Sequence, residues 1–286
     1  MKTQSSPPVS KRLTQATLIG LPTDVGASRL GAAMGPDALR VAQLAPALER
    51  LGVRVNDLGN LSGPPNPRGA RDMQGLRVLI TAGPTCENID PVRFITNRSS
   101  GKMGYALAEA ALRRGAQVTL VTGPVSLTPP QGAQVEPVRT TEDLLQRMLA
   151  LAPEQDIVIQ AAAPADDRAQ QIAPQKLKKQ GDGALTLTFV PTPDVAKAVG
   201  EGKHDGQILV GFAAETETAV ENARKKLDSK HLDMIVANDV TQPGAGFDVD
   251  TNIATIITHQ QAESLPIMTK KALADEILTR ALALRG

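Results

Sequence analysis

Residues 76–127 read LRVLITAGPTCENIDPVRFITNRSSGKMGYALAEAALRRGAQVTLVTGPVSL, and the pattern of this stretch decides the fold. The apolar run 78–82 ends at a Gly-Pro pair, which is typical of a buried strand. A polar loop leads to residues 101–114, where apolar residues recur at helical spacing until a glycine follows. Residues 118–121 form a second apolar run. The order strand, loop, helix, strand predicts one βαβ unit.

The loop that leads into this helix is rich in glycine and in cationic side chains. Residues 97–104 read NRSSGKMG, and Arg93, Arg98 and Lys102 supply positive charge. A helix N-terminus offers free N–H groups and a partial positive charge, and both attract phosphate. The same residues also fit an ordinary helix start with surface cations. The loop matches neither the Walker A pattern nor the GxGxxG fingerprint.

The composition argues against several classes of function. Cationic and anionic side chains balance to a net charge of +1, and one Tyr with no Trp argues against a base-stacking nucleic-acid surface. His204, His231 and His259 show no metal-ligand spacing, and the single cysteine, Cys86, fits a reducing compartment. No apolar run approaches the roughly 20 residues that span a bilayer, and residues 1–15 lack the apolar core of a signal peptide. We therefore expect a soluble, cytoplasmic protein with a disordered tail over residues 1–15.

Residues 16–61 form a separate N-terminal segment. Apolar runs at 17–21 and 53–58 predict two strands, and residues 36–51 predict a helix between them, which together make a small βαβ-like unit. The wording IGLPTDVGASRLGAAMGPDALRVAQL, followed by LGVRVNDLGNL, resembles the N-terminal segment of the ureohydrolase family, which includes arginase and agmatinase. That family holds two manganese ions through later motifs such as Asp-Ala-His-x-Asp. No such motif occurs in this chain, so ureohydrolase activity is not expected.

A Pro- and Gly-rich stretch at 62–74 predicts a linker before a second domain at 75–286. In that domain further strands are expected at 135–138, 156–162, 185–190, 208–212, 234–237 and 253–257, and further helices at 140–152, 193–199, 217–227 and 270–284. Thr140 and Asp143 have the spacing of a capping box.

The alternation predicts an α/β fold with a doubly wound, Rossmann-like, mostly parallel sheet and a β-hairpin extension at 185–190. Ligands of such sheets bind at the carboxyl ends of the strands. The polar loops that we expect to meet there are 83–100, 163–176, 213–216 and 238–247.

A series of motifs in this domain carries a second resemblance. They are TAGPT, IDPVRFITNRSSGKMGYALAEAA, AAPAD at 162–166, a Lys-Leu-Lys-Lys run at 176–179, TPDV at 192–195, GFAAETE, MIVANDV and GFDVDTN. In this order they resemble the phosphopantothenate–cysteine ligase (phosphopantothenoylcysteine synthetase) family over residues 75–286. The chain departs from the pattern of that family at Cys86, Pro164, Asp167, Ala169 and Thr192.

The resemblance implies an enzyme of coenzyme A biosynthesis that joins 4'-phosphopantothenate to L-cysteine. In that reaction the carboxylate of phosphopantothenate attacks the α-phosphate of CTP, pyrophosphate leaves, and the cysteine amine then displaces CMP from the acyl-cytidylate. The resemblance also implies Mg²⁺ or Mn²⁺ bound with CTP. It further implies a homodimer, with the hairpin after Lys176 as an exchange element.

The resemblance also assigns residues to the site. Arg93, Asn97 and Ala162 would bind phosphopantothenate, while Lys176 and Asn97 would act in catalysis, with Lys176 supporting the second step. The nucleotide would contact Ala161, Ala162, Asp166, Lys176, Thr192, Pro193, Asp194, Val195, Phe212, Lys226 and Lys230, and the phosphate loop would be Ser99, Ser100, Gly101 and Lys102. Residues four apart share one face of a helix, so Lys226 and Lys230 would form one cationic patch. Taken alone, these lysines also fit a solvated surface.

Two other classes of function remain as alternatives to the ligase. A nucleotide-dependent oxidoreductase would use the same sheet, but it would show GxGxxG followed by an acidic residue about 20 positions later. A non-catalytic nucleotide-binding relic would keep the motifs and lose turnover. A nucleotide-binding assay paired with a pyrophosphate-release assay separates relic from enzyme.

Overall fold

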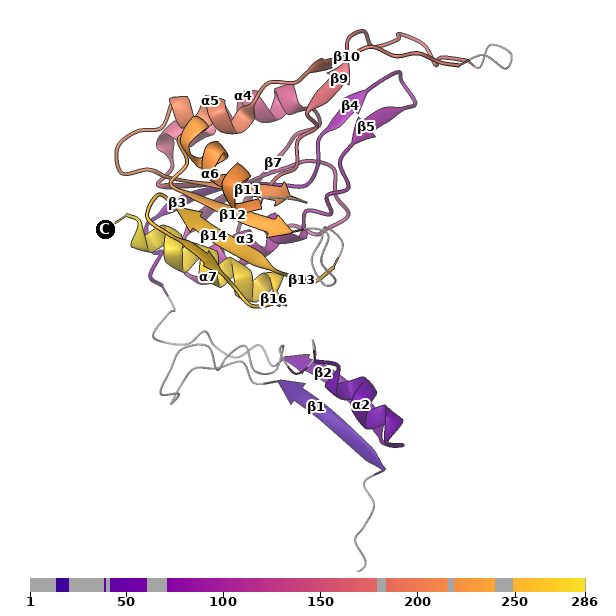
Figure 1. Ribbon diagram of the computed structural model, residues 1–286, viewed down its shortest axis with the longest axis vertical. Coiled ribbons are helices and arrows are strands. Elements are labelled where there is room, and N and C mark those ends of the chain that lie inside the picture. The colour runs from indigo at the N-terminus through magenta and orange to yellow at the C-terminus, as the bar shows by residue number, and fades with distance from the viewer. Residues whose placement is uncertain are drawn as a thin grey trace, which may run out of the picture. The chain divides into compact units, whose positions relative to one another are not determined.

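The computed structural model describes residues 14–20, 39, 42–60, 71–178, 184–215, 219–239 and 249–285. The chain divides into two compact units, Met1–Asn66 and Pro67–Gly286 (Figure 1). Among the described residues, no helix is long and apolar enough to cross a membrane.

The N-terminal unit contains a small parallel βαβ arrangement. Strand β1 (Gln15–Gly20) pairs in parallel with β2 (Arg54–Asn60), and helix α2 (Leu44–Arg50) lies between them in the chain. The helix expected over 36–51 is interrupted: Leu39 is helical and α2 begins at Leu44, but Gln43 between them has a φ of 59°, which is left-handed and breaks a helical backbone. Residues 36–38, 40 and 41 of the expected helix lie outside the described residues.

The second unit is built on a sheet that has eight strands in the described part of the chain, in the order β15-β14-β12-β11-β8-β3-β6-β7. The strands are β3 (Arg77–Ala82), β6 (Gln117–Thr122), β7 (Gln134–Pro137), β8 (Ile157–Gln160), β11 (Ile208–Glu215), β12 (Met234–Asp239), β14 (Ala254–Thr258) and β15 (Ala262–Ser264). The run from β12 to β7 is parallel, whereas β14 and β15 add in antiparallel fashion at one edge. The predicted mostly parallel, Rossmann-like sheet is confirmed.

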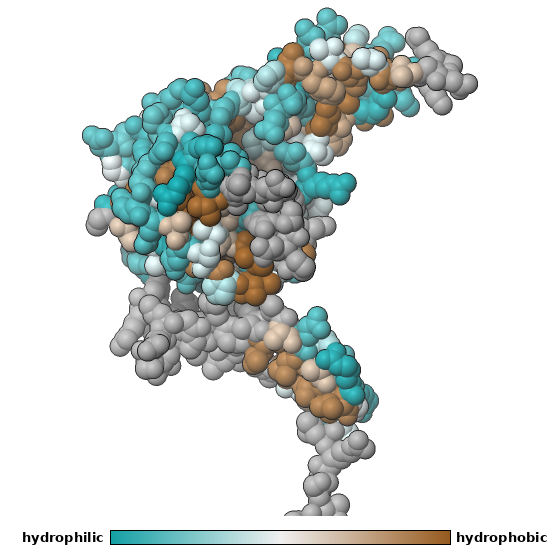
Figure 2. All heavy atoms as spheres, in the orientation of Figure 1, coloured by the Kyte–Doolittle hydropathy of each residue, from teal (hydrophilic) through white to brown (hydrophobic). Residues whose placement is uncertain are grey.

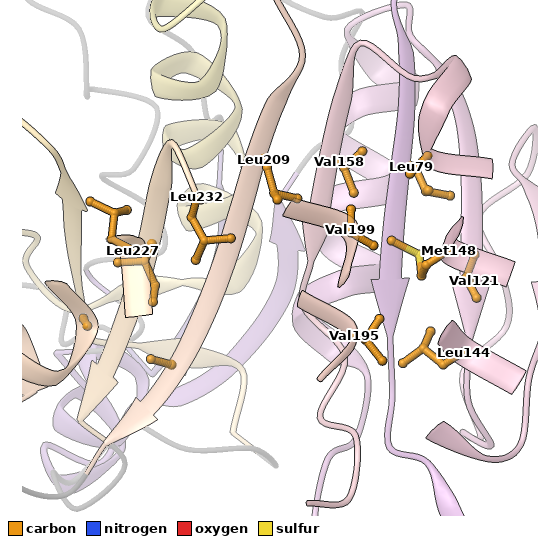
Figure 3. Packing of buried hydrophobic residues seen from close by; sticks show 14 of the residues in the cluster. Leu79, Val121, Leu144, Met148, Val158, Val195, Val199, Leu209, Leu227 and Leu232 are labelled. Atoms are coloured by element: carbon orange, nitrogen blue, oxygen red, sulfur yellow. The ribbon is translucent and has the colours of Figure 1, made fainter. Parts of the chain in front are cut away.

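Helices cover both faces of this sheet. On one face lie α3 (Lys102–Arg113) and α7 (Lys270–Ala283), and on the other lie α4 (Thr141–Leu151), α5 (Val195–Glu201) and α6 (Ala219–Ser229), as Figure 1 shows. Figure 3 shows the core on the second face, where Leu79, Val158 and Leu209 of the strands pack with Met148 and Val199 of the helices. Because the sheet is buried on both faces, its central strands are almost entirely apolar.

A capping box explains where α4 begins. Thr140 Oγ1 accepts from the Asp143 backbone N–H at 3.1 Å, and the Asp143 carboxylate accepts from the Thr140 N–H at 2.9 Å, so the predicted capping box is confirmed.

Helix α3 runs close to β3 because residue 104 is glycine. A Cβ on Gly104 would lie 2.5 Å from the Ala82 Cβ and 2.8 Å from the Thr81 carbonyl oxygen.

Two short hairpins project from the carboxyl side of the sheet and lie side by side (Figure 1). Strand β4 (Cys86–Asn88) pairs with β5 (Phe94–Thr96), and β9 (Asp167–Ala169) pairs with β10 (Phe189–Pro191). We call the described residues of 86–96 and 167–191 the arm.

The arm corrects two expectations. The strand expected at 185–190 begins only at residue 189, and its partner β9 lies inside the loop expected at 163–176. The β4–β5 hairpin was expected to be loop, because strands of three residues carry no readable alternation. The turn at 181–183 lies outside the described residues.

The end of the expected linker belongs to the packed second unit. Met73 is fully buried and its N–H donates to the Arg114 carbonyl oxygen at 3.1 Å, while the Asp72 carboxylate pairs with the Arg114 guanidinium.

Two short strands form a separate antiparallel pair: β13 (Thr251–Asn252) and β16 (Met268–Thr269), which directly precedes α7. A single 3₁₀ turn, η2 (Ala152–Glu154), follows α4.

Candidate functional site

A cavity of about 670 Å³ lies at the carboxyl ends of β3, β8, β11 and β12. Of the residues assigned from the sequence, those that line it are Asn97, Ser99, Ser100, Gly101, Lys102, Ala161, Ala162, Asp166, Thr192, Pro193, Asp194, Val195, Phe212, Lys226 and Lys230. The expected meeting of the loops at this edge is therefore observed for their described parts. Residues 216 and 240–247 of those loops lie outside the described residues.

Two buried threonines, Thr81 at the end of β3 and Thr85 in the loop that follows it, bind the loop after β8. Thr81 Oγ1 accepts from the Ala162 N–H at 2.9 Å, and Thr85 Oγ1 accepts from the Ala165 N–H at 2.9 Å. Thr85 also exchanges a hydrogen bond with Thr141 Oγ1 at 2.9 Å. Both threonines are 1% exposed, so these bonds are shielded from water and fix one wall of the cavity.

The start of α3 faces the cavity. Gly101 is the N-cap, with a φ of 78°, and no side chain of a described residue caps the helix. The left-handed backbone favours glycine, and an added Cβ would also lie 2.9 Å from Val125 Cγ1. The N–H groups and the partial positive charge at the start of this twelve-residue helix suit an anion. Lys102, the first residue of the helix, pairs with Asp250 at 2.9 Å.

Asn97 couples the loop before α3 to the loop after β8. Its Nδ2 donates to the carbonyl oxygens of Pro164 at 2.8 Å and Ala163 at 3.3 Å. Thr192 supports the same loop, because its Oγ1 donates to the Ala165 carbonyl at 2.6 Å. Pro164 and Thr192 are departures from the pattern of the resembled family, yet both take part in the contacts that hold this wall.

Lys226 of α6 and Lys230, which follows that helix, form a cationic wall of the cavity. Helix α6 ends at Ser229, and the Lys230 N–H donates to the Lys226 carbonyl at 3.1 Å, so both lysines reach the cavity. Lys230 Nζ lies 3.0 Å from the Asp194 carboxylate, which also caps α5 by accepting from the Lys197 N–H. Burial raises the pKa of Asp194, but the hydrogen bonds from the Lys197 N–H and from Lys230 outweigh it and leave that pKa lowered.

The cavity also contains polar residues that were not assigned to the site from the sequence: Gln160, Asn252, Lys270 and Asn238, the last at the start of the loop expected at 238–247. Gln160 Nε2 and Asn238 Oδ1 are buried and have no hydrogen-bond partner within the described chain. Gln160 ends β8 and Asn238 lies near the end of β12. Both residues are polar and lie at the end of an otherwise apolar strand. This pattern could have identified them as candidate site residues, because ligands of such sheets bind at the carboxyl ends of the strands.

The two orphaned groups lie on opposite faces of the sheet. Side chains alternate along a strand, and Val158 and Ile235 belong to the core under α4–α6. Gln160 therefore shares that face with Val158, whereas Asn238 lies on the face covered by α3 and α7. The cavity thus spans the carboxyl edge of the sheet and reaches polar groups of both faces.

Arg93 and Lys176 do not line the cavity. Both lie on the arm, where Arg93 pairs with Asp90 and donates to the backbone of Leu177, the neighbour of Lys176. The contact with Leu177 places Arg93 beside the segment that carries Lys176, while the other residues assigned to the site line the cavity.

Two family models match the chain. The model described as DNA/pantothenate metabolism flavoprotein C-terminal domain covers residues 73–284, and the model of the Arginase family covers residues 14–130. The second match agrees with the ureohydrolase resemblance of the N-terminal segment. It covers less than half of the chain and continues into the second unit.

Individual proteins agree with the first family. The coenzyme A biosynthesis bifunctional protein CoaBC of Bacillus subtilis (strain 168) is 52% identical over 214 residues, which is 74% of this chain and 52% of that protein. The chain therefore spans about half the length of the curated relatives it matches. The crystal structure of the C-terminal domain of a CoaBC protein has a TM-score of 0.64 at 42% identity, over 76% of this chain and 97% of that one.

A more distant structure shows the same fold. A Cab2 variant in complex with phosphopantothenate-cysteine has a TM-score of 0.61 at 17% identity, over 88% of this chain and 94% of that one. The match over residues 73–284 and the identity to the CoaBC domain show that the chain belongs to the family of the DNA/pantothenate metabolism flavoprotein C-terminal domain.

Proposed function

We propose that this chain joins 4'-phosphopantothenate to L-cysteine in coenzyme A biosynthesis and uses CTP to activate the carboxylate. The observation that carries the proposal is the cavity, in which loops far apart in sequence place the N-terminus of α3, Lys226 and Lys230 around one space. Relatives named for coenzyme A biosynthesis, and a structure of this fold solved with phosphopantothenate-cysteine, support the choice of substrates.

In the first step of the proposed reaction, a carboxylate oxygen of phosphopantothenate bonds to the α-phosphorus of CTP. The bond to the bridging oxygen breaks and pyrophosphate leaves. Lys226 and Lys230 would stabilise the triphosphate charge on one side of the cavity, and the N–H groups at the start of α3 would stabilise phosphate on the other.

In the second step the cysteine amine attacks the acyl carbon, loses a proton, and CMP leaves. Asn97 is proposed to hold the acyl group of the intermediate. Its amide already donates to two carbonyls of the loop after β8, and the longer of these bonds, 3.3 Å to Ala163, is the one it would exchange for the ligand. Asn97 would thereby couple binding of the intermediate to the position of that loop.

Mg²⁺ or Mn²⁺ is proposed to arrive with CTP. Within the described residues no cluster of three His, Cys, Asp or Glu side chains could hold a metal ion. The residues fit a cation that is held mainly by phosphates and water, with Asp166 as a carboxylate at the cavity. Such an ion would neutralise charge on the triphosphate.

The test of this function is pyrophosphate release with 4'-phosphopantothenate and cysteine present, measured separately with CTP and with ATP. We expect release with CTP and much slower release with ATP. Equal or faster release with ATP would overturn the choice of nucleotide. Nucleotide binding without pyrophosphate release in any combination would show a non-catalytic relic.

The partner of this chain is proposed to be a second copy, bound through the arm. Val92, Phe94, Ile172, Leu185 and Phe189 are large apolar residues of the arm that are exposed, and Figure 2 shows hydrophobic surface along it. Apolar surface gathered on a projecting hairpin is typical of an interaction site.

Light scattering after gel filtration tests this assembly. We expect a dimer for the parent protein and a shift toward monomer for Phe94→Asp combined with Phe189→Asp. Ile267→Asp, an exposed apolar residue outside the arm, is the matched control and is expected to stay dimeric. A monomeric parent protein would exclude the dimer.

A further inference from the structure

Glu87 is a buried glutamate that no step of the proposed reaction uses. It lies in the middle of β4, at the root of the arm, and is 4% exposed. Its Oε1 accepts from the backbone N–H of Thr141 at 2.7 Å, although the two residues are 54 positions apart. Removing a carboxylate from water is costly, so the fold must compensate its charge.

The start of α4 supplies this compensation, because Glu87 caps that helix from a distant strand. Thr141 is the first residue of α4, and the N–H groups of a first turn have no partner within their own helix. Thr140 satisfies the Asp143 N–H, and Glu87 satisfies the Thr141 N–H. The helix dipole also favours a negative charge at this end. Glu87 therefore fixes the start of α4 against β4.

The hydrogen bonds continue from Thr141 to the loop that lines the cavity. Thr141 Oγ1 lies 2.9 Å from Thr85 Oγ1, and Thr85 Oγ1 accepts from the Ala165 N–H at 2.9 Å. The Ala165 carbonyl accepts from Thr192 Oγ1 at 2.6 Å and from Thr141 Oγ1 at 3.4 Å. The backbone of Ala165 is thus held at both its N–H and its carbonyl by three threonines.

The residue that follows shows what these contacts set. Ala165 and Asp166 both line the cavity, and the Asp166 carbonyl accepts from the Thr192 N–H at 2.9 Å. With the backbone held on both sides, the direction in which the Asp166 side chain leaves the loop is fixed as well. Helix α4 contributes Leu144 to the same cavity. Glu87 is therefore connected to the cavity through Thr141 and Ala165.

We propose that Glu87 is a positioning residue, which holds the loop 163–166 and with it Asp166 in place for the nucleotide. This inference rests on the proposed function, in which Asp166 meets the nucleotide and its cation. An apolar side chain at position 87 could fill the same space, but only an acceptor can hold the Thr141 N–H and so fix the threonine hydroxyls behind it. Because Glu87 belongs to β4, the same contacts join the root of the arm to the cavity wall.

Hydrogen exchange followed by mass spectrometry tests the contacts without any turnover. In Glu87→Leu, which loses the acceptor, we expect the peptide that contains Ala165 to exchange several times faster than in the parent. Glu87→Gln keeps an oxygen acceptor and should stay close to the parent. Gln207→Leu is the matched control. It removes hydrogen bonds to the carbonyls of Ala152 and Gln155, beyond the other end of α4, and should leave the Ala165 peptide at the parent rate.

Steady-state kinetics test whether the position of the loop matters for the reaction. Glu87→Leu should raise KM for CTP about tenfold, and Glu87→Gln should restore most of the loss. If Glu87 acts through Asp166, adding Glu87→Leu to Asp166→Asn should change KM for CTP little further. Additive effects, or an unchanged KM for CTP in Glu87→Leu, would show a purely structural role and overturn the proposal.

Thr85→Val breaks the same series of contacts one step nearer the cavity. Valine has the shape of threonine without the hydroxyl, so this variant serves if Glu87→Leu fails to fold, and it should reproduce the faster exchange and the raised KM for CTP. Exchange at the parent rate in both variants would overturn the proposal. Faster exchange in a protein that releases no pyrophosphate with any nucleotide would refute the proposed reaction while establishing the hold of Glu87 on the loop.

Discussion

Two glutamines whose side-chain Nε2 atoms are buried show how the cavity differs from the core at the level of single residues. Gln207 Nε2 donates to the carbonyl oxygens of Ala152 at 2.7 Å and Gln155 at 2.8 Å, so its burial is compensated. Gln160 Nε2 has no partner in the part of the chain that the structure describes. An unsatisfied buried donor costs about 1–3 kcal/mol, so we infer that a ligand atom is its partner.

Gln160→Leu should therefore stabilise the ligand-free protein and weaken nucleotide binding. We expect the melting temperature without ligand to rise and KM for CTP to rise about tenfold, because an acceptor on the ligand loses its donor. Gln207→Leu is the control and should lower the melting temperature. A melting temperature that falls in both variants would show that Gln160 serves packing alone.

Asp90 predicts how stability responds to acid. The Arg93 guanidinium, and after it the backbone N–H groups of Val92, Leu177 and Arg93, hold the pKa of Asp90 well below its usual range, although burial acts to raise it. Because the folded pKa lies below the unfolded value, the stabilisation is present above about pH 4 and is lost as pH falls through the folded pKa.

We expect the free energy of unfolding in urea to fall more steeply below about pH 4 in the parent than in Asp90→Asn. Circular dichroism at a series of pH values measures it. Parallel curves for the two proteins would contradict a pKa shift at Asp90. Asp143→Asn, another carboxylate with a lowered pKa, shows how much of any difference belongs to Asp90.

At the level of elements, the start of α4 depends on one reciprocal pair of hydrogen bonds. Thr140→Ala removes the side-chain acceptor of the Asp143 N–H and should cost about 1 kcal/mol of stability. Thr140→Ser keeps that acceptor and should stay close to the parent. Urea denaturation of the three proteins checks this, and an unchanged alanine variant would mean that solvent replaces the cap at no cost.

The contact between α3 and β3 depends on the absence of a side chain at Gly104. Alanine is normally favoured over glycine in a helix by about 1 kcal/mol, but here its Cβ would meet the Ala82 Cβ and the Thr81 carbonyl. We expect Gly104→Ala to destabilise the protein by about 1–3 kcal/mol and to weaken CTP binding, because α3 carries the phosphate loop.

Gly202→Ala is the control for Gly104→Ala, since the nearest atom to an added Cβ there is 3.7 Å away. It should be nearly neutral in thermal melting. If Gly104→Ala were neutral as well, the helix and the strand could separate without cost, and the position of the phosphate loop would not depend on this contact.

At the level of the whole molecule, the two compact units predict independent function for the second one. A protein that begins at Pro67 keeps Asp72 and Met73, which pack in that unit. We expect its kcat for pyrophosphate release to lie within about twofold of the full chain. A folded truncated protein that has lost most of its kcat would make the N-terminal unit part of the working enzyme.

The sequence predicted the sheet because its strands are buried on both faces. Apart from Thr81, runs such as 78–82 and 208–212 contain no polar residue, and the helices between them are amphipathic, so both signals depend only on neighbouring residues. The strands of the arm were not predicted, because they lack such a local pattern. Strands β4 and β9 read Cys-Glu-Asn and Asp-Arg-Ala, and their pairing depends on residues distant in sequence.

The candidate site was predicted in the same uneven way. Residues inside continuous motifs, such as Asn97 and Asp166, were found and line the cavity. Asn238 begins a loop that was expected at this edge, but it was not assigned to the site, because its isolation from other polar groups appears only when the strands are assembled. The contact of Arg93 with Leu177 was also hidden, since it joins two loops across the arm.

The packing of α7 beside α3 has a consequence for how the chain folds during synthesis. Arg113 pairs with Asp275 at 2.6 Å and Arg114 donates to Thr279 at 3.1 Å, so α7 lies beside α3, which itself packs on β3 and β6. Helix α3 leaves the ribosome long before α7. A nascent chain therefore leaves part of that apolar face uncovered while the later strands are translated, and we expect it to be most prone to aggregation during this interval.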